Sequence, residues 1–120
     1  MLWISFAWTT PALLAGKKTV TRRAWKTVWA RRFRKGDLVT AFDKQPRYGG
    51  HPVAVIRLIA DPVQEQLADA PELDWEAEGF AYLSDIGERV HGQVPEDVWN
   101  DWMTNYDMVY VVRFELVEVL

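Results

Sequence analysis

The segment Ala15–Arg23 places two threonine hydroxyls among four cationic side chains, where a predicted helix passes into a predicted strand. A threonine hydroxyl becomes a useful nucleophile only when a neighbouring base removes its proton. Lys18 can serve as that base if its pKa is lowered, and burial or the neighbouring cations would lower it. The segment therefore predicts either a nucleophilic site at Thr21 or a basic strand edge that only binds phosphate groups or faces solvent.

The backbone sets a condition on this pair. In an unbroken strand Lys18 and Thr21 point to opposite faces, because the side-chain period is two. They can meet only if Lys18 lies in the turn between helix and strand, or if the strand bulges. Gly16 favours such a turn, since glycine commonly ends a helix.

Other catalytic arrangements are poorly represented. Cysteine is absent, which excludes thiol catalysis and cysteine-based metal sites and fits a reducing cytoplasm. Ser5 and Ser84 stand in no nucleophile motif, and no glycine-rich phosphate loop occurs. His51 and His91 are far apart in the chain and lack clustered acids, so each is interpreted as an isolated exposed or core histidine. We therefore expect neither a metal nor a cofactor.

Several short strands and helices must position this segment, and together they predict one α+β domain over 1–120. The predicted strands are Leu2–Phe6, Thr19–Arg23, Leu38–Phe42, Pro52–Ala60 and Asp107–Val119. Helices are expected at 10–16, 25–33, Val63–Leu67, Asp74–Leu83 and Pro95–Met103, the last three within an acidic helical insertion at roughly 61–104. This order favours a small, mostly antiparallel sheet or β-barrel with helices at one end over a doubly wound sheet.

Charge is divided between the two halves of the chain. The net charge of −3 combines +10 over residues 1–60 with −13 over residues 61–120, and 16–36 holds nine cations and no acid. This division predicts either a surface that faces a polyanion or two halves that pair with each other. Three aromatic residues follow one another at intervals of four: Trp25, Trp29 and Phe33. We interpret them as a helical core stripe or as residues that stack on bases, and we interpret Tyr48 as an exposed aromatic residue in a loop.

Export and membrane insertion are not expected. Residues 1–16 carry no charged side chain, but Thr9, Thr10 and Pro11 interrupt them, and the cations follow rather than precede them. No apolar run is long enough to cross a bilayer. The expected location is the cytoplasm.

The spacing Gly-x-Lys-x-x-x-x-Arg, at Gly16, Lys18 and Arg23, resembles the signature of the ASCH domain family. This resemblance implies a PUA-like β-barrel that binds RNA or a modified nucleobase. It extends along most of the chain in the family's order, through Leu13–Gly16, Lys35–Leu38, Ala77–Phe80 and Val109–Val119.

One bacterial branch of small ASCH proteins hydrolyses N4-acetylcytidine, and its proposed lysine, threonine and glutamate match Lys18, Thr21 and Glu78. Thr21 would attack, and Lys18 would accept its proton or hold the oxyanion. Glu78 would accept a proton, act through a water molecule, or bind the edge of the nucleobase. A carboxylate close to Lys18 would, however, raise the pKa of the lysine. Judged from the residues alone, Glu78 is interpreted as an exposed helix carboxylate. This chain has a fuller basic helix and a longer, more tryptophan-rich insertion than that branch.

The first prediction is therefore an RNA- or nucleoside-binding cleft built on Gly16–Arg23. The alternatives are an N4-acetylcytidine amidohydrolase and, because another ASCH protein was described as a ribonuclease, a metal-independent ribonuclease. The residues expected to bind RNA or a nucleobase are Gly16, Lys17, Arg22, Arg23, Lys26, Arg31, Arg32 and Tyr48. The predicted partner is RNA or a modified nucleoside.

Overall fold

The computed structural model describes all residues, 1–120, and contains six strands and five α-helices. The strands are β1 (Trp3–Ser5), β2 (Val20–Arg23), β3 (Leu38–Phe42), β4 (Pro52–Leu58), β5 (Val63–Gln66) and β6 (Met108–Val119). The helices are α1 (Thr10–Leu14), α2 (Thr27–Ala30), α3 (Asp74–Ala77), α4 (Phe80–Asp85) and α5 (Pro95–Trp102). Short 3₁₀ turns η1 (Ala7–Thr9), η2 (Pro46–Tyr48) and η3 (Leu67–Asp69) join some of them.

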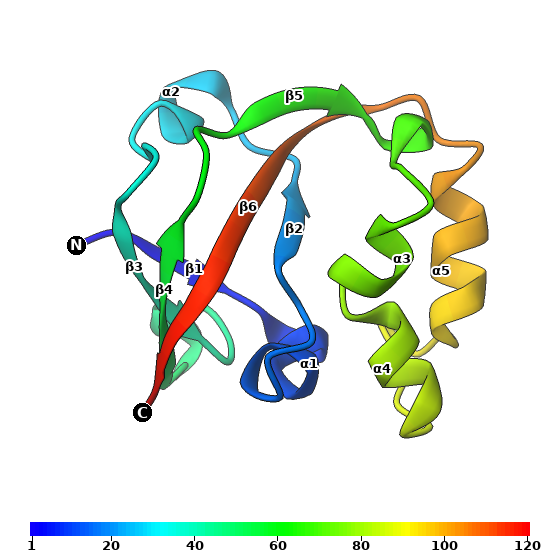
Figure 1. Cartoon of the computed structure of the whole chain (residues 1–120), viewed down its shortest axis with the longest axis horizontal. Helices are drawn as coiled ribbons and strands as arrows, with labels where there is room; N and C mark the ends of the chain where they lie inside the picture. Colours follow the sequence, from blue (N-terminus) through cyan, green and yellow to red (C-terminus); the bar gives the residue numbers. More distant parts are fainter.

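The strands form one mixed sheet that curls into a half-barrel, which confirms the predicted mostly antiparallel α+β fold. The strand order is β1-β3-β4-β6-β2, with β5 also paired to β6. Only β1 and β3 are parallel to each other. The long strand β6 crosses the middle of the molecule and holds the sheet together, because β4, β2 and β5 all pair with it (Figure 1).

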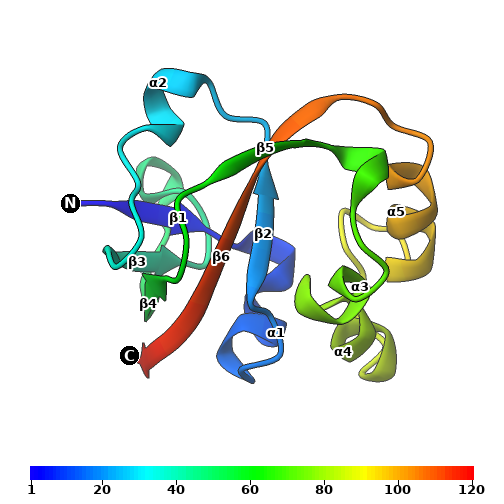
Figure 2. The same ribbon diagram turned by 45° about the horizontal axis from the view of Figure 1, so that its top comes forward.

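Two hydrophobic clusters stabilise this arrangement. One fills the inside of the curled sheet and includes Ile4, Ile56 and Phe114. The other holds the helices together around Phe80 and Leu83, with Trp75, Trp99 and Trp102 packed against it. Figures 1 and 2 show α3, α4 and α5 gathered on one side of the molecule, facing β2 and α1. The candidate segment Gly16–Arg23, which ends in strand β2, therefore lies where the sheet faces the helices.

The predicted helix at 25–33 is wrong beyond one short turn. Helix α2 covers only Thr27–Ala30, and Trp25 and Phe33 lie outside it. Their rings stack with centroids 4.7 Å apart, whereas residues eight apart in an α-helix are separated by roughly 12 Å along the axis. The chain folds back here, and the stacked rings of Trp25 and Phe33 bury apolar surface at the fold.

The acidic region also differs from expectation at two points. Val63–Gln66, expected to be helical, is strand β5, because the long strand β6 offers an edge to which it pairs. The expected helix over Asp74–Leu83 is divided into α3 and α4 by Gly79, whose φ of +88° is left-handed. No helix of the structure has the length and apolar character needed to cross a membrane.

Candidate functional site

Lys18, Thr21 and Glu78 line one cavity of about 210 Å³ between the sheet and the helices. Lys18 lies in the turn between α1 and β2, as the backbone argument required, and its amide donates a hydrogen bond to the carbonyl of Ala12 at 3.2 Å. Thr21 lies within β2, and Glu78 follows the last residue of α3. Residues from three separate parts of the fold therefore meet at this cavity, which we call the lysine cavity.

Lys18 is almost completely buried, with 2% of its surface exposed. Its Nζ donates to Glu78 Oε1 at 2.8 Å and to the Glu78 main-chain carbonyl at 2.9 Å. Burial lowers the pKa of Lys18, and this effect outweighs the opposing charge of Glu78. The pKa of Lys18 therefore lies below its ordinary value although Glu78 is directly hydrogen-bonded to it.

Glu78 is also buried, so its interpretation as an exposed carboxylate is wrong. Its second oxygen, Oε2, accepts a hydrogen bond from Arg22 Nη1 at 2.7 Å. The other terminal nitrogen of Arg22 donates to Glu65 at 3.0 Å and to Asp74. Arg113 binds the same Asp74 with both terminal nitrogens, at 3.1 and 2.9 Å. The carboxylates and cations around Arg22 form a network, the ion-pair cluster, in which only the buried Nε of Arg22 has no hydrogen-bond partner.

This cluster determines what Arg22 can do. Burial alone would lower the pKa of its guanidinium, but Glu78, Asp74 and Glu65 together raise it. Hydrogen bonds from Arg113 and Arg22 lower the pKa of Asp74, although burial opposes them. Arg22 is thus bound to carboxylates inside the protein, whereas the sequence predicts it to contact RNA or a nucleobase.

The next residue, Arg23, has a different environment. Its Nε donates to Thr21 Oγ1 at 3.1 Å, and its guanidinium lies 5.4 Å from the centre of the Phe6 ring. It makes no ion pair, and burial lowers its pKa to about 10. A hydroxyl that accepts a hydrogen bond from a guanidinium is stabilised when negative charge develops on its oxygen. Thr21 is therefore suited to act as a nucleophile in this cavity.

The structure brings together five of the sequence-predicted site residues: Lys18, Thr21, Arg22, Arg23 and Glu78. The others lie elsewhere. Gly16 and Lys17 border a separate hollow on the outer side of the turn, and Lys26 lines a large groove next to β1. The remaining three are exposed: Arg31, Arg32, whose guanidinium lies over Trp29, and Tyr48, which lies under Arg47.

Sequence reasoning missed several participants. Asp74 and Glu78 are four residues apart, and this spacing would have placed two carboxylates on one helical face. Arg113 is the only charged residue within the apolar run Met108–Phe114, which is also a detectable signal. His91 lines the lysine cavity from the loop before α5, and no local pattern indicates this. Within the whole chain, no group of three metal-ligating side chains is arranged to hold an ion.

Comparison with known proteins supports the fold. No family model matches the chain, and no curated protein matches it. A solved Enterococcus faecalis protein of family DUF984 is similar, with a TM-score of 0.57 and 16% identity, over 99% of this chain and 80% of that one. An ASCH protein from Zymomonas mobilis is similar with a TM-score of 0.52 and 15% identity, over 98% of this chain and 71% of that one. The curled half-barrel with helices packed against one side is therefore an ASCH-like fold.

Proposed function

We propose that this chain binds an acylated nucleobase in the lysine cavity and hydrolyses its amide bond, with N4-acetylcytidine as the first substrate to test. The observation that supports this proposal is the meeting of a buried lysine, a hydrogen-bonded threonine hydroxyl and a carboxylate at one cavity. The volume of about 210 Å³ lies below the roughly 300–1,000 Å³ of sites that enclose a drug-sized ligand. It suits the acylated edge of one base rather than a whole nucleotide.

In the proposed reaction, Thr21 Oγ1 attacks the acyl carbon while neutral Lys18 accepts the hydroxyl proton. The carbon–nitrogen bond breaks, the amine leaves with that proton, and the acyl group remains on Thr21 as an ester. Water then hydrolyses the ester, which releases the carboxylic acid and restores the hydroxyl. One water is consumed for each amide that is cleaved.

The neighbouring charges support these roles. Both carboxylate oxygens of Glu78 already accept hydrogen bonds, one from Lys18 and one from Arg22. Glu78 therefore acts as a positioning residue that holds the lysine amine in the cavity. Arg23 donates to the threonine oxygen and stabilises the negative charge that develops there.

The test is incubation of the purified protein with N4-acetylcytidine and chromatographic detection of cytidine. Thr21→Val is nearly isosteric and should lower kcat/KM by at least about 1,000-fold, because it removes the nucleophile. Thr19→Val makes the same chemical change at an exposed position outside the lysine cavity and serves as the matched control. Equal activity of the two variants would contradict the assignment of Thr21.

The pH profile tests the role of Lys18 separately. Because the base must be unprotonated, kcat/KM should rise with pH through the pKa of Lys18 and level off above it. Burial lowers this pKa, so the midpoint should fall below the ordinary lysine value of about 10.4. A rate that stays flat up to that value would contradict a lysine base.

A second candidate is recognition of a nucleobase without hydrolysis. It is favoured by the ion-pair cluster, in which both Glu78 side-chain oxygens already accept hydrogen bonds from cations. In that case Thr21→Val should retain nucleoside binding, and wild-type protein should release no cytidine. Unmodified RNA in the same assay tests the ribonuclease alternative, since a ribonuclease would cleave it without an acetyl group.

A further inference from the structure

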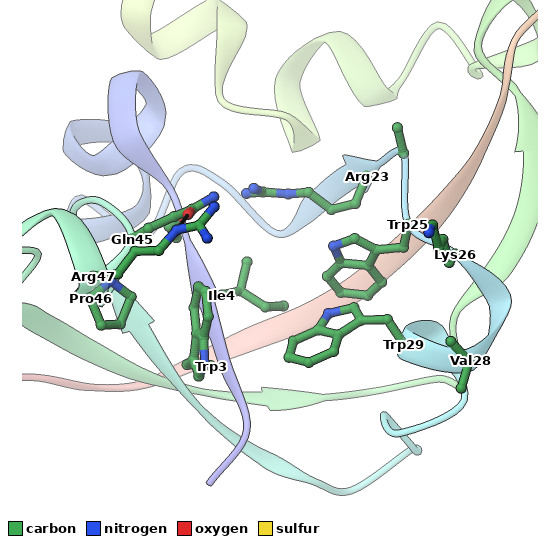
Figure 3. A pocket seen from close by; sticks show the side chains of 12 residues that line it. Trp3, Ile4, Arg23, Trp25, Lys26, Val28, Trp29, Gln45, Pro46 and Arg47 are labelled. Atoms are coloured by element: carbon green, nitrogen blue, oxygen red, sulfur yellow. Dashed lines mark hydrogen bonds between the residues drawn. The ribbon is translucent and has the colours of Figure 1, made fainter.

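A groove of about 730 Å³ lies next to β1, beyond the lysine cavity (Figure 3). We call it the tryptophan groove, because the indole rings of Trp3, Trp25 and Trp29 line it. Its volume lies within the roughly 300–1,000 Å³ of sites that enclose a small molecule. The groove is therefore large enough to hold a ligand of its own.

The walls of the groove offer flat apolar surfaces. In Figure 3, Trp25 and Trp29 lie on one side and Trp3 lies across from them. All three side chains are half-buried, and Phe33 stacks on one face of Trp25 at 4.7 Å between centroids. Trp3 meets Trp29 edge-on, at 6.2 Å between centroids. Rings that are held by neighbours and still partly exposed favour a planar ligand, because little further ordering is needed when it binds.

The charge of the groove has a single sign. Its lining contains three cationic side chains, Arg23, Lys26 and Arg47, and no carboxylate. None of the three forms an ion pair anywhere in the chain. The groove therefore favours an anionic ligand and disfavours a cationic one.

Arg23 is held so that its terminal nitrogens stay free. Its Nε donates to Thr21 Oγ1 at 3.1 Å, and its guanidinium lies 5.4 Å from the centre of the Phe6 ring. The two terminal nitrogens donate no hydrogen bond within the protein. Burial lowers the pKa of Arg23 to about 10, and an anion bound at these nitrogens would favour the charged form again.

Arg47 is held in the same way. Its Nε donates to Gln45 Oε1 at 3.1 Å, and its guanidinium lies 5.0 Å from the centre of the Tyr48 ring. In Figure 3 the guanidinium groups of Arg23 and Arg47 extend toward each other across one end of the groove. Two guanidinium groups that are oriented in this way and have free terminal nitrogens match the oxygens of a carboxylate or a phosphate.

The positions of the cations distinguish between these anions. The two arginines converge on one end, whereas Lys26 is exposed and lies beside Trp25 (Figure 3). A single nucleic-acid strand would require cations that follow its backbone along the groove. One anionic head group with an apolar body fits better, with the head at the arginines and the body among the indole rings. A carboxylate carries less charge than a phosphate monoester, so it loses less hydration free energy between apolar walls.

We propose that the tryptophan groove binds a small aromatic carboxylate, with its carboxylate between Arg23 and Arg47 and its rings between Trp3 and Trp25. Arg23 also lines the lysine cavity, but the two sites are separate in their other contacts apart from Ser5. The inference goes beyond the proposed hydrolysis and does not rest on it.

The first test is isothermal titration calorimetry with 2-naphthoate and three matched compounds. 2-Naphthamide keeps the rings without the charge, acetate keeps the charge without the rings, and 2-naphthyl phosphate changes the head group. We expect 2-naphthoate to bind at least about 10-fold more tightly than either 2-naphthamide or acetate, because the arginines and the rings both contribute. Binding of 2-naphthamide or 2-naphthyl phosphate as tight as that of 2-naphthoate would overturn the proposal.

The second test asks whether Arg47 contacts the charge of the ligand. Arg47→Gln should weaken the binding of 2-naphthoate at least about 10-fold and that of 2-naphthamide less than about 2-fold. Arg57→Gln makes the same change at an exposed position outside the groove and is the matched control. Equal weakening of both compounds, or equal effects of the two variants on 2-naphthoate, would contradict the assigned carboxylate contact.

The contribution of the rings is tested by Trp25→Leu, which should weaken the binding of 2-naphthoate at least about 5-fold through the loss of one aromatic wall. Urea unfolding of this variant shows whether it is folded. Unchanged binding by the folded variant would contradict the assigned position of the rings.

Two further measurements separate this site from the alternatives. A five-nucleotide RNA is titrated under the same conditions, and binding of the RNA without binding of 2-naphthoate overturns the proposal. Release of cytidine from N4-acetylcytidine is measured independently. Binding of 2-naphthoate that Arg47→Gln weakens supports the groove even if no cytidine is released, whereas cytidine release without 2-naphthoate binding overturns only the groove.

Discussion

Arg22 and Arg23 are consecutive residues of β2, yet they belong to regions of opposite character. Arg22 enters the ion-pair cluster, where three carboxylates bind it and raise its pKa. Arg23 borders the tryptophan groove, has no carboxylate partner, and has its pKa lowered to about 10 by burial. Both arginines line the lysine cavity, but only Arg23 also reaches the tryptophan groove, the groove next to β1 that Trp3, Trp25 and Trp29 line.

The charge of Arg22 holds the fold together, whereas the charge of Arg23 is available to a ligand. In the ion-pair cluster each charged group has partners of opposite sign, so a substitution there should act mainly on stability. In the tryptophan groove three cations face solvent-accessible space without an acid, so a substitution there should act mainly on binding. Measurements of unfolding therefore test this division directly.

The largest effect on stability is expected from Asp74→Ala. It leaves the buried Arg22 and the partly buried Arg113 short of a partner, and removing one side of a buried ion pair costs about 3–5 kcal/mol. Urea unfolding measures this change. Glu115→Gln, which removes an exposed partner of Arg57, is the comparison and should cost less than about 1 kcal/mol. Similar losses for both variants would show that the cluster is not a special stabilising element.

Acid should destabilise the wild-type protein through the same carboxylate. Because the folded-state pKa of Asp74 is lowered, its contribution is complete above the unfolded-state value of about 3.9. That contribution is lost as the pH falls through the folded-state pKa. Urea midpoints between pH 6 and pH 2 should therefore fall more steeply for wild type than for Asp74→Asn. Parallel curves would mean that other carboxylates cause the acid unfolding.

A smaller loss is expected from Gly79→Ala, at the break that places Glu78 in the cavity. Its left-handed backbone and a Cβ that would lie 2.6 Å from the Cβ of Ala12 together cost about 2–3 kcal/mol. Gly87→Ala is the matched control, since φ is +74° there but no atom lies within 4 Å. It should cost only about 1–2 kcal/mol, the backbone part alone. Thermal unfolding of both variants separates the steric contribution from the backbone contribution.

The smallest effect on stability is expected in the tryptophan groove. Arg47 is exposed and hydrogen-bonds only Gln45, so Arg47→Gln should change the free energy of unfolding by less than about 0.5 kcal/mol. Urea unfolding of this variant and of Asp74→Ala gives the two free energies of unfolding to be compared. A loss comparable to that of Asp74→Ala would place Arg47 in the structural framework and remove the contrast between the two regions.

Much of the fold was predictable because its signals are local. Three elements could be placed from such signals: β3 from the strand pattern of Leu38–Phe42, α5 from the proline at its start, and the end of α1 from the glycine that follows it. The helix predicted over 25–33 is reduced to α2, because the spacing of apolar residues does not distinguish a long helix from a chain that folds back on itself. Val63–Gln66 became a strand because a distant partner, β6, was available to pair with it.

The sequence by itself determined which residues were candidates: the run of cations and hydroxyls in Gly16–Arg23, and Glu78 through the family resemblance. Tertiary structure decided their environments. Lys18 and Glu78 are 60 residues apart, and only the packing of α4 and the residues before it against α1 and the turn after α1 brings Lys18 Nζ within 2.8 Å of Glu78 Oε1. A pKa depends on burial and on nearby charges, which are set by contacts between distant segments. For that reason the sequence identified the lysine, and only the fold could show that it is buried, paired with Glu78 and in the same cavity as Thr21.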